Sequence, residues 1–285
     1  MKSYFKPAAL GIIAILAMSA CSSTPPGAAD SVSDDCQPLH QDLKTLEEGV
    51  LTVAQYEYVP FSMSEGPGTL TGLEGDVLTR FAELECLDLK INKGDSAAMI
   101  TSVATGRADT TLGSWYRTEQ RAQKVRLSAP IVTSPLSSIT KEGAETVDDL
   151  TEMSIGVGQG LIGVDELKEI FGGSLKIYQN DDAVYEDIKS GRIDGSVQGY
   201  IAGNEYLKKH GIQGFKVVPL EVDSRLTSTK AAGQTNFPVS KDNSQLGTAI
   251  DEVIAQMRES GELDEIAEKY GLDTQIMHPG EPNLL

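Results

Sequence analysis

Strand-like and helix-like hydrophobic patterns alternate along this chain from Gly49 onward, and this alternation limits its possible folds more than any other feature. The first run, at 50–54, is short and rich in β-branched residues, as expected of a buried strand. Val77, Phe81 and Leu84 follow at the spacing of one helix face. Chains in which strands alternate with helices form largely parallel sheets covered by helices. The pattern therefore predicts an α/β fold.

The alternation begins again after about residue 150, so the chain repeats its plan. Ser96 and Thr118 are suitable N-caps for two helices of the first half. A wide apolar stripe from Leu246 to Tyr270 predicts helical packing on a core, followed by an irregular tail at 278–285. The other expected elements are strands at 50–54, 108–112, 125–127, 154–157, 175–178 and 193–197, and helices at 164–171 and 181–190.

A short internal repeat supports this plan. The sequence is Thr-Gly-Arg-Ala-Asp at 105–109 and Ser-Gly-Arg-Ile-Asp at 190–194. Each copy places a glycine at the end of a predicted helix, just before a predicted strand. The two copies suggest two lobes of related design.

Residues 1–20 have the order of a secretion signal. Lys2 and Lys6 flank the start, and residues 8–17 are almost wholly apolar. This apolar run is too short to cross a hydrocarbon layer of about 30 Å, which favours a signal peptide. The alternative is a signal anchor that stays attached.

The residues before Cys21, Met18-Ser19-Ala20, are similar to the lipobox of bacterial lipoproteins, although Met18 stands where Leu is commoner. In such proteins the cysteine is diacylated and becomes the first residue. Residues 21–35 are mostly Ser, Pro, Ala, Gly and Asp, a composition typical of a flexible tether. The resemblance implies an exported protein held by a lipid on Cys21 at the outer face of the cell membrane, at the cell surface or in the periplasm.

The cysteine count agrees with export. If Cys21 carries lipid, Cys36 and Cys86 remain as a pair in an oxidising compartment, where we expect them to form a disulfide. The alternative is two buried free thiols.

The charge balance disfavours two classes of partner. Lys and Arg total 24 against 42 Asp and Glu, a net charge of −18. Removal of residues 1–20 takes two lysines and no acid, and 22 minus 42 gives −20. Such a charge repels phosphate backbones and anionic lipid surfaces, so no nucleic-acid partner is expected.

A series of short motifs then occurs in a specific order and spacing. They are Tyr58-Val59-Pro60-Phe61, Gly72-Leu73-Glu74-Gly75-Asp76-Val77, the repeat at 105–109, Arg117-Thr118-Glu119-Gln120-Arg121-Ala122, Leu127-Ser128-Ala129-Pro130, Gly156-Val157-Gly158-Gln159-Gly160, the repeat at 190–194, and Asn236-Phe237-Pro238-Val239.

From about Leu51 to Leu272 these motifs resemble the solute-binding proteins of polar amino-acid ABC importers, bacterial extracellular solute-binding family 3. The resemblance implies a two-lobe, type II periplasmic-binding-protein-like α/β fold with the ligand in the cleft between the lobes. Lobe 1 would comprise 36–134 and 228–285 and lobe 2 would comprise 135–227, with crossings near Thr133 and Thr227. It also implies a small polar solute, amino-acid-like or a carboxylate, and ABC permease subunits as partners. We expect a monomer with no cofactor and no metal.

The resemblance assigns Arg121 to the ligand carboxylate. A planar guanidinium offers paired donors that match a carboxylate and keeps its charge in a closed cleft. Thr118, three residues earlier, is a suitable helix cap, so Arg121 would lie in the first turn of a helix. The free backbone N–H groups of that turn also favour an anion. The alternative is that Arg121 is one more solvated arginine beside Arg117 and Arg126.

Other ligand positions of the family fall on both predicted lobes. Tyr58 would offer a flat face to the ligand, and Ser114 a backbone N–H and a hydroxyl. Tyr116 stands where the family has Ser or Thr, and Gly160-Leu161-Ile162 stands where it has Gly-Thr-Thr. The positions are Gln55, Tyr58, Ser96, Gly113, Ser114 and Tyr116 in lobe 1, and Gly160, Leu161 and Gly199 in lobe 2.

Gly199 is the largest departure, because the family has there the Asp that binds the ligand's α-ammonium group. A glycine cannot pair with an ammonium. Either another acid takes its place, or the ligand is not a standard α-amino acid. Gln198 and Tyr200 are the neighbours that could compensate.

The residues also allow two other interpretations. Residues 158–163 have the sequence G-x-G-x-x-G, which is the pattern of a dinucleotide-binding loop; Asp181 or Asp182 would then be the acidic residue that binds the ribose. The same pattern also occurs by chance in glycine-rich turns of α/β proteins. His40, His210 and His278 are isolated, and no catalytic motif occurs, so the chain is not expected to be an enzyme. The remaining alternatives are a dehydratase-like enzyme of the same fold and a sensor or adhesin without transport.

Overall fold

The computed structural model describes residues 1–2, 35–66 and 68–285. The predicted lipidation site Cys21 and nearly all of the predicted signal peptide (1–20) and tether (21–35) lie outside the described residues. Within the described part, no helix has both the length and the apolar character needed to cross a membrane.

The elements follow the alternation that the sequence predicts. The strands are β1 (Val50–Gln55), β2 (Met63–Gly66), β3 (Thr69–Thr71), β4 (Asp88–Lys93), β5 (Thr110–Leu112), β6 (Arg126–Leu127), β7 (Thr133–Ser134), β8 (Leu136–Thr140), β9 (Ile155–Gly158), β10 (Leu175–Tyr178), β11 (Gly195–Gly199), β12 (Lys216–Pro219), β13 (Gly233–Gln234) and β14 (Pro238–Val239). The helices are α1 (Leu73–Leu84), α2 (Ser96–Ala104), α3 (Glu119–Lys124), α4 (Val164–Phe171), α5 (Asp181–Ser190), α6 (Tyr200–His210), α7 (Ser244–Ser260) and α8 (Glu262–Lys269), with short 3-10 turns at Asp148–Leu150, Gly172–Ser174, Thr227–Thr229 and Thr274–Met277.

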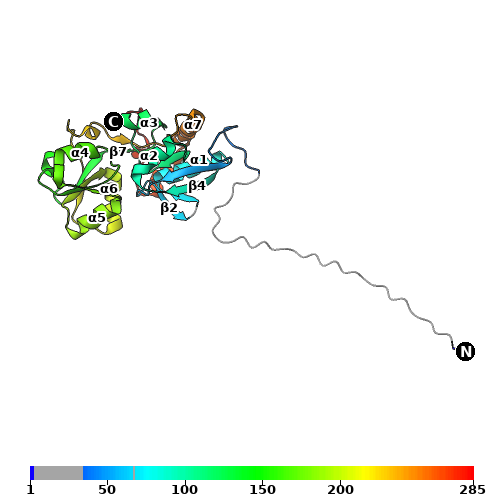
Figure 1. Ribbon diagram of the computed structural model, residues 1–285, viewed down its shortest axis with the longest axis horizontal. Helices are drawn as coiled ribbons and strands as arrows, with labels where there is room; N and C mark the ends of the chain where they lie inside the picture. Colours follow the sequence, from blue (N-terminus) through cyan, green and yellow to red (C-terminus); the bar gives the residue numbers. More distant parts are fainter. Residues whose placement is uncertain (3–34, 67) are drawn as a thin grey trace.

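Two five-stranded sheets form two lobes, which lie side by side in Figure 1. Lobe 1 has the strand order β4-β1-β5-β14-β6, and lobe 2 has the order β10-β9-β11-β8-β12. In lobe 1, β1 pairs in parallel with β4 on one side and β5 on the other, and β14 pairs antiparallel with β5 and β6. In lobe 2, β9 pairs in parallel with β10 and β11, and β8 pairs antiparallel with β11 and β12. Both sheets are therefore mixed rather than largely parallel. The predicted two-lobe α/β fold is confirmed.

The internal repeat has the same structural role in each lobe. Asp109 accepts a hydrogen bond from the backbone N–H of Thr52 at 2.8 Å and donates its own N–H to the Thr52 carbonyl. Asp194 does the same with Ser154, the residue before β9. Asp109 therefore ties the chain entering β5 to β1, and Asp194 ties the chain entering β11 to the start of β9.

The chain crosses between the lobes twice. The outgoing segment β7 pairs antiparallel with the returning segment β13, through Ser134 with Gly233 and Thr133 with Gln234. The return lies C-terminal to the position near Thr227 suggested by the sequence. Thr227 still belongs to lobe 2, where its hydroxyl donates to Glu166 of α4 at 2.6 Å.

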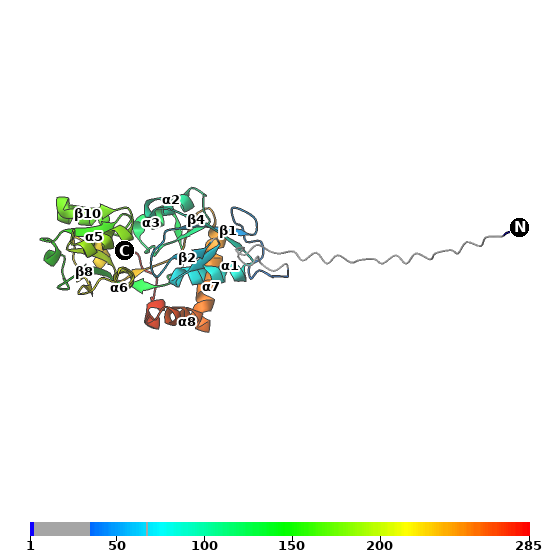
Figure 2. The ribbon, with the colours of Figure 1, turned by 90° about the horizontal axis from the view of Figure 1, so that it is seen from below.

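Helices cover both faces of the lobe-1 sheet. Successive residues of β1 point to opposite faces, so Leu51 and Val53 pack in one buried cluster and Ala54 in another. The first cluster includes Phe81 of α1 and Ile250 of α7. Figure 2 shows α1 and α7 on one side of β1, and α2 and α3 on the other.

Some elements were not predicted from the sequence. Helix α6 begins directly after Gly199, which supplies no side-chain cap, so the usual sequence signal of a helix start is missing. Thr118 caps α3 as predicted, because its hydroxyl accepts from the backbone N–H of Arg121 at 3.1 Å. Ser96, in contrast, is the first residue of α2 rather than its cap, which is Asp95.

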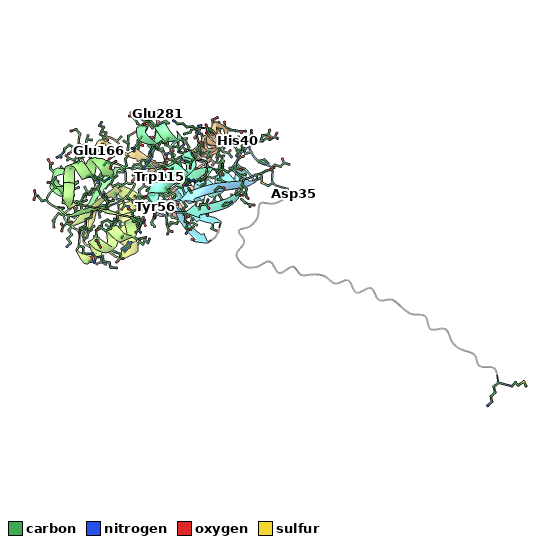
Figure 3. The ribbon with its side chains drawn as sticks, viewed as in Figure 1. Asp35, His40, Tyr56, Trp115, Glu166 and Glu281 are labelled. Atoms are coloured by element: carbon green, nitrogen blue, oxygen red, sulfur yellow. A yellow bond between two sulfur atoms is a disulfide. The ribbon has the colours of Figure 1, made fainter. Side chains whose placement is uncertain are left out.

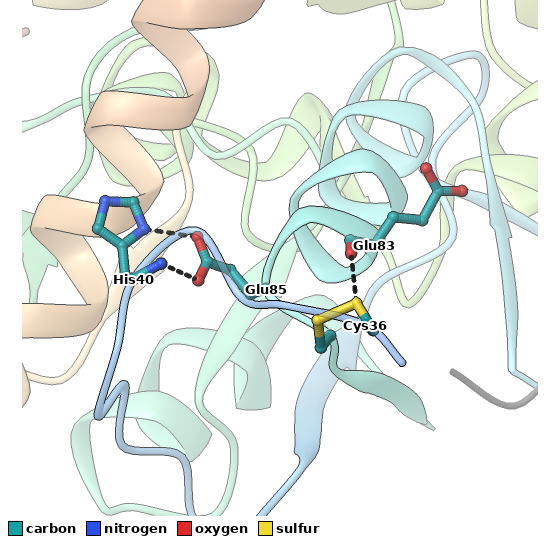
Figure 4. Close-up of a disulfide and its surroundings, with 5 residues drawn as sticks. Cys36, His40, Glu83 and Glu85 are labelled. Atoms are coloured by element: carbon teal, nitrogen blue, oxygen red, sulfur yellow. Dashed lines mark hydrogen bonds and ion pairs between the residues drawn. A yellow bond between two sulfur atoms is a disulfide. The ribbon is translucent and has the colours of Figure 1, made fainter. Parts of the chain in front are cut away.

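The predicted disulfide between Cys36 and Cys86 is confirmed, with 5.8 Å between the Cα atoms. It joins the segment before β1 to the end of α1 (Figure 4). His40 supports the same junction: its ring nitrogens lie 2.5 Å from Glu85 and 2.8 Å from Glu252 of α7. The N-terminal segment is therefore fixed to two helices of lobe 1.

Replacing both cysteines by serine should lower the free energy of unfolding by about 4 kcal/mol, because the cross-link closes a loop with a sequence separation of 50. Urea unfolding of the full-length chain measures this difference. A reducing agent should lower the stability of the wild type to that of the variant and leave the variant unchanged. Equal stability of the two oxidised proteins would contradict the prediction.

Candidate ligand-binding site

A small cavity of about 40 Å³ lies between the two lobes. Hydrogen bonds from Tyr56 to Asp181 and from Ser96 to Gln159 cross between the lobes beside it, so the lobes are closed on each other. A larger cavity of about 440 Å³ adjoins it and shares Arg121 and Gly160 with it. Figure 3 shows Tyr56 and Trp115 on the side of lobe 1 that is directed toward lobe 2. The lining residues are Tyr56, Tyr58, Ser96, Gly113, Ser114, Trp115, Tyr116 and Arg121 from lobe 1, and Gly158, Gln159, Gly160, Leu161, Ile162, Asp181 and Gly199 from lobe 2.

Of the ligand positions expected from the sequence, all except Gln55 line this cavity. Gln55 is fully buried at the end of β1, and its side-chain amide donates to the Ser62 hydroxyl at 3.3 Å. Gln55 therefore belongs to the interior of lobe 1. The binding roles of the other residues stay predictions.

Arg121 is half-buried in the cleft and contacts both lobes. One guanidinium nitrogen donates to the carbonyl of Tyr116 at 2.7 Å and the other to the carbonyl of Gly160 at 3.5 Å. The guanidinium also lies over the Trp115 ring, 5.2 Å from its centroid. Burial lowers the pKa of Arg121 to about 10, so it remains a cation at neutral pH. Among the residues that the structure describes, no carboxylate forms an ion pair with it.

The two other arginines of this stretch are engaged elsewhere. Arg117 donates to the carbonyls of Ser128 and Asn283, and Arg126 pairs with Asp251 at 2.8 Å. Neither lines the cavity. Arg121 is thus distinguished from its neighbours by position.

The loop at Gly113 and Ser114 is held by a buried carboxylate that the sequence reasoning missed. Glu74, at the start of α1, accepts from the backbone N–H groups of Gly113 at 3.0 Å and Ser114 at 2.8 Å. Burial raises the pKa of Glu74, and these hydrogen bonds oppose that shift. The Ser114 N–H is therefore already used, which corrects the expectation that it would be offered to a ligand. Its hydroxyl remains in the cavity wall.

The glycines of residues 158–163 allow the lobes to approach. A Cβ at Gly160 would lie 2.8 Å from the Ser96 hydroxyl of lobe 1, and Gly160 has a φ of +85°. The Ser96 hydroxyl donates across the cleft to the carbonyl of Gln159. In this protein the glycines of the G-x-G-x-x-G sequence therefore permit a close contact between the lobes.

Asp181 is a second residue whose place in the site was missed. It is the first residue of α5, it is buried, and it lines the cavity from lobe 2. It accepts from the hydroxyl of Tyr56 in lobe 1 at 2.6 Å and from the amide of Gln198 at 3.0 Å. Burial raises its pKa to about 6. Sequence reasoning considered Asp181 only as a ribose acid.

Tyr116 occupies the space beside Gly199. A Cβ at Gly199 would lie 2.8 Å from the Tyr116 hydroxyl, which donates to the carbonyl of Ser134 in the outgoing crossing segment at 3.0 Å. Of the two neighbours considered as substitutes, Tyr200 is exposed and Gln198 is turned toward Asp181.

The three histidines lie outside the cavity, and each is near carboxylates. His40 contacts Glu85 and Glu252, and His278 contacts Asp264. His210 contacts Asp182 and Glu186. Within the described part of the chain, no group of three or more residues is arranged to hold a metal ion.

Comparisons with known proteins agree with this geometry. The model of a family described as "Bacterial extracellular solute-binding proteins, family 3" matches residues 51–273. The L-cystine-binding protein TcyJ of Escherichia coli (strain K12) is 27% identical over 233 residues, which are 80% of this chain and 84% of that protein. The lysine/arginine/ornithine-binding periplasmic protein of the same organism is 26% identical over 236 residues, 79% of this chain and 88% of that protein.

The fold has solved counterparts. The crystal structure of a substrate-binding protein of an amino acid ABC transporter superposes with a TM-score of 0.69 at 23% identity, covering 78% of this chain and 99% of that chain. At this identity the likeness supports the two-lobe fold.

The contact between residues 116 and 199 can be tested by a double-mutant cycle. Gly199→Ala should lower the free energy of unfolding by roughly 1–3 kcal/mol, because the new methyl group meets the Tyr116 hydroxyl. The backbone at Gly199 is ordinary for an L-residue, with a φ of −62°, so the effect is steric. In a Tyr116→Phe background the same change should cost clearly less. Equal costs in both backgrounds, measured by urea unfolding, would contradict the contact.

Proposed function

Because this chain belongs to the bacterial extracellular solute-binding proteins, family 3, we propose that it captures a small polar solute of the amino-acid or carboxylate class and delivers it to an ABC permease. The observation that carries this proposal is the half-buried guanidinium of Arg121, which lines the interlobe cavity without a carboxylate partner among the described residues. The named relatives bind cystine or lysine, arginine and ornithine, and each of these solutes has a carboxylate.

The chemistry of the site suits such a solute. The Tyr116 carbonyl and the Trp115 ring hold the Arg121 guanidinium in place, so a carboxylate can accept its remaining N–H groups. Aromatic faces of Tyr56 and Tyr58 line the same space and can cover the apolar part of the solute.

Binding would be coupled to closure of the lobes. Hydrogen bonds between the lobes close this cavity, so we expect a solute to enter it when the lobes separate. Separation breaks the bonds from Tyr56 to Asp181 and from Ser96 to Gln159, while β7 and β13 stay connected. A solute that contacts both lobes then favours the closed form, and the permease would recognise that shape.

Arg121→Gln should weaken binding of a carboxylate solute by at least about 2 kcal/mol, or roughly 30-fold, because a charged hydrogen-bond donor is lost from a buried site. Calorimetry with the full-length chain measures the affinity. The probes are L-cystine, L-lysine, L-arginine and L-ornithine, first ranked by the thermal shift that each produces.

Arg107→Gln is the matched control, since Arg107 carries the same charge and is exposed just after α2, away from the residues that line the cavity. It should leave the affinity unchanged. An unchanged affinity in Arg121→Gln, or an equal loss in both variants, would exclude Arg121 as the carboxylate partner.

We also propose that a lipid on Cys21 holds the protein at the outer face of the membrane. The lipobox-like residues before Cys21 and the composition of 21–35 support this proposal. The tether would let the lobes fold and bind solute in the aqueous phase.

Cys21→Ser should release the protein from the membrane, because the lipid has no other attachment point. Cell fractionation and immunoblotting measure the distribution, with the Cys36/Cys86 double serine variant as a control that should stay attached. Membrane attachment of Cys21→Ser would exclude the lipid anchor.

A further inference from the structure

We propose that Asp181 is the carboxylate that binds the α-ammonium group of the solute, in the place left by the glycine at residue 199. This inference rests on the proposed function, in which Arg121 binds the carboxylate of the same solute.

Two opposite charges without ionic partners line one cavity. Asp181 is 8% exposed, and its carboxylate accepts hydrogen bonds from the neutral groups of Tyr56 and Gln198. Among the described residues, no lysine, arginine or histidine forms an ion pair with it, just as no carboxylate pairs with Arg121. A buried charge is costly unless it is paired. A zwitterion placed between Arg121 and Asp181 would pair both charges at once.

Asp181 has the capacity to accept an ammonium. A carboxylate offers about four acceptor sites, and one donor occupies each of its oxygens here. These two donors come from different lobes, Tyr56 from lobe 1 (Figure 3) and Gln198 from lobe 2, and they fix the carboxylate against the cavity. The remaining acceptor sites suit the N–H groups of a primary ammonium.

Residue 199 cannot perform this role. The Tyr116 hydroxyl lies 2.8 Å from the position of a Cβ at Gly199, so an aspartate side chain has no room there. A bulky residue at 116 therefore fits beside a residue without a side chain at 199. In this proposal the acidic partner lies at the start of α5 rather than at the end of β11.

The arrangement predicts selectivity for amino acids over simple carboxylates. A solute with a carboxylate but no α-ammonium leaves Asp181 unpaired, and sites built around a polar group reject analogues that lack it.

The test compares Asp181→Asn with Asp182→Asn in the full-length chain. Both variants remove one negative charge from the first turn of α5. Asp182 lies outside the cavity, half-exposed, and pairs with Lys209 and His210. The probes are L-cystine, L-arginine and L-lysine, each beside its analogue without the α-ammonium: 3,3′-dithiodipropionate, 5-guanidinopentanoate and 6-aminohexanoate.

For each amino acid that binds the wild type, we expect Asp181→Asn to lower the affinity roughly tenfold or more. The analogue of that amino acid should bind the wild type more weakly than the amino acid does, by a similar factor. Asp181→Asn should not weaken the analogue further, and Asp182→Asn should change neither affinity.

Two results would overturn the inference and leave the proposed function intact: an unchanged affinity in Asp181→Asn, or an equal loss for amino acid and analogue. If Arg121→Gln also leaves binding unchanged, or if no probe binds the wild type, the proposed function is wrong and the inference falls with it.

Discussion

The antiparallel pairing of β7 with β13 is the constraint on which the site depends. Because the chain leaves and re-enters lobe 1 through two adjacent segments, this separate two-stranded sheet joins the two lobes, and the cleft lies between them. Residues that follow the parallel strands then meet in that cleft: Tyr56 after β1, the 113–116 loop after β5, and Gln159 after β9. Ligands of open α/β sheets bind beyond the carboxyl ends of the strands. Here two such edges share one site.

The three charges near the site are all held by neutral groups. Glu74 accepts from the backbone N–H groups of Gly113 and Ser114, Asp181 from a hydroxyl and an amide, and Arg121 donates to a carbonyl and lies over an aromatic ring. Neutral groups fix the position of a charge without cancelling it. Position then separates the two carboxylates: Glu74 is fully buried behind the wall of the cavity, and Asp181 lines the cavity itself.

Much of this architecture could be read from local sequence. Hydrophobic periodicity located most of the strands and helices, and helix α5 and strand β10 have the predicted bounds. The cysteine count predicted the disulfide, and the resemblance pointed to Arg121. Asp181 could not be found in this way, because its neighbour Tyr56 is 125 positions away and in the other lobe. Helix α6 lacks a cap, and the Tyr116–Gly199 contact arises only when the crossing segment brings the lobes together.

The two unpaired charges also bear on how the lobes close. In an open form, water can solvate both Arg121 and Asp181, so neither carries a large penalty. Closure around an empty cavity removes that water and leaves a cation and an anion without ionic partners, which opposes the closed form. A zwitterionic solute cancels this cost while it adds contacts to both lobes, so its binding energy differs between the two forms. The same pair of residues would then set both the choice of solute and the response that a permease detects.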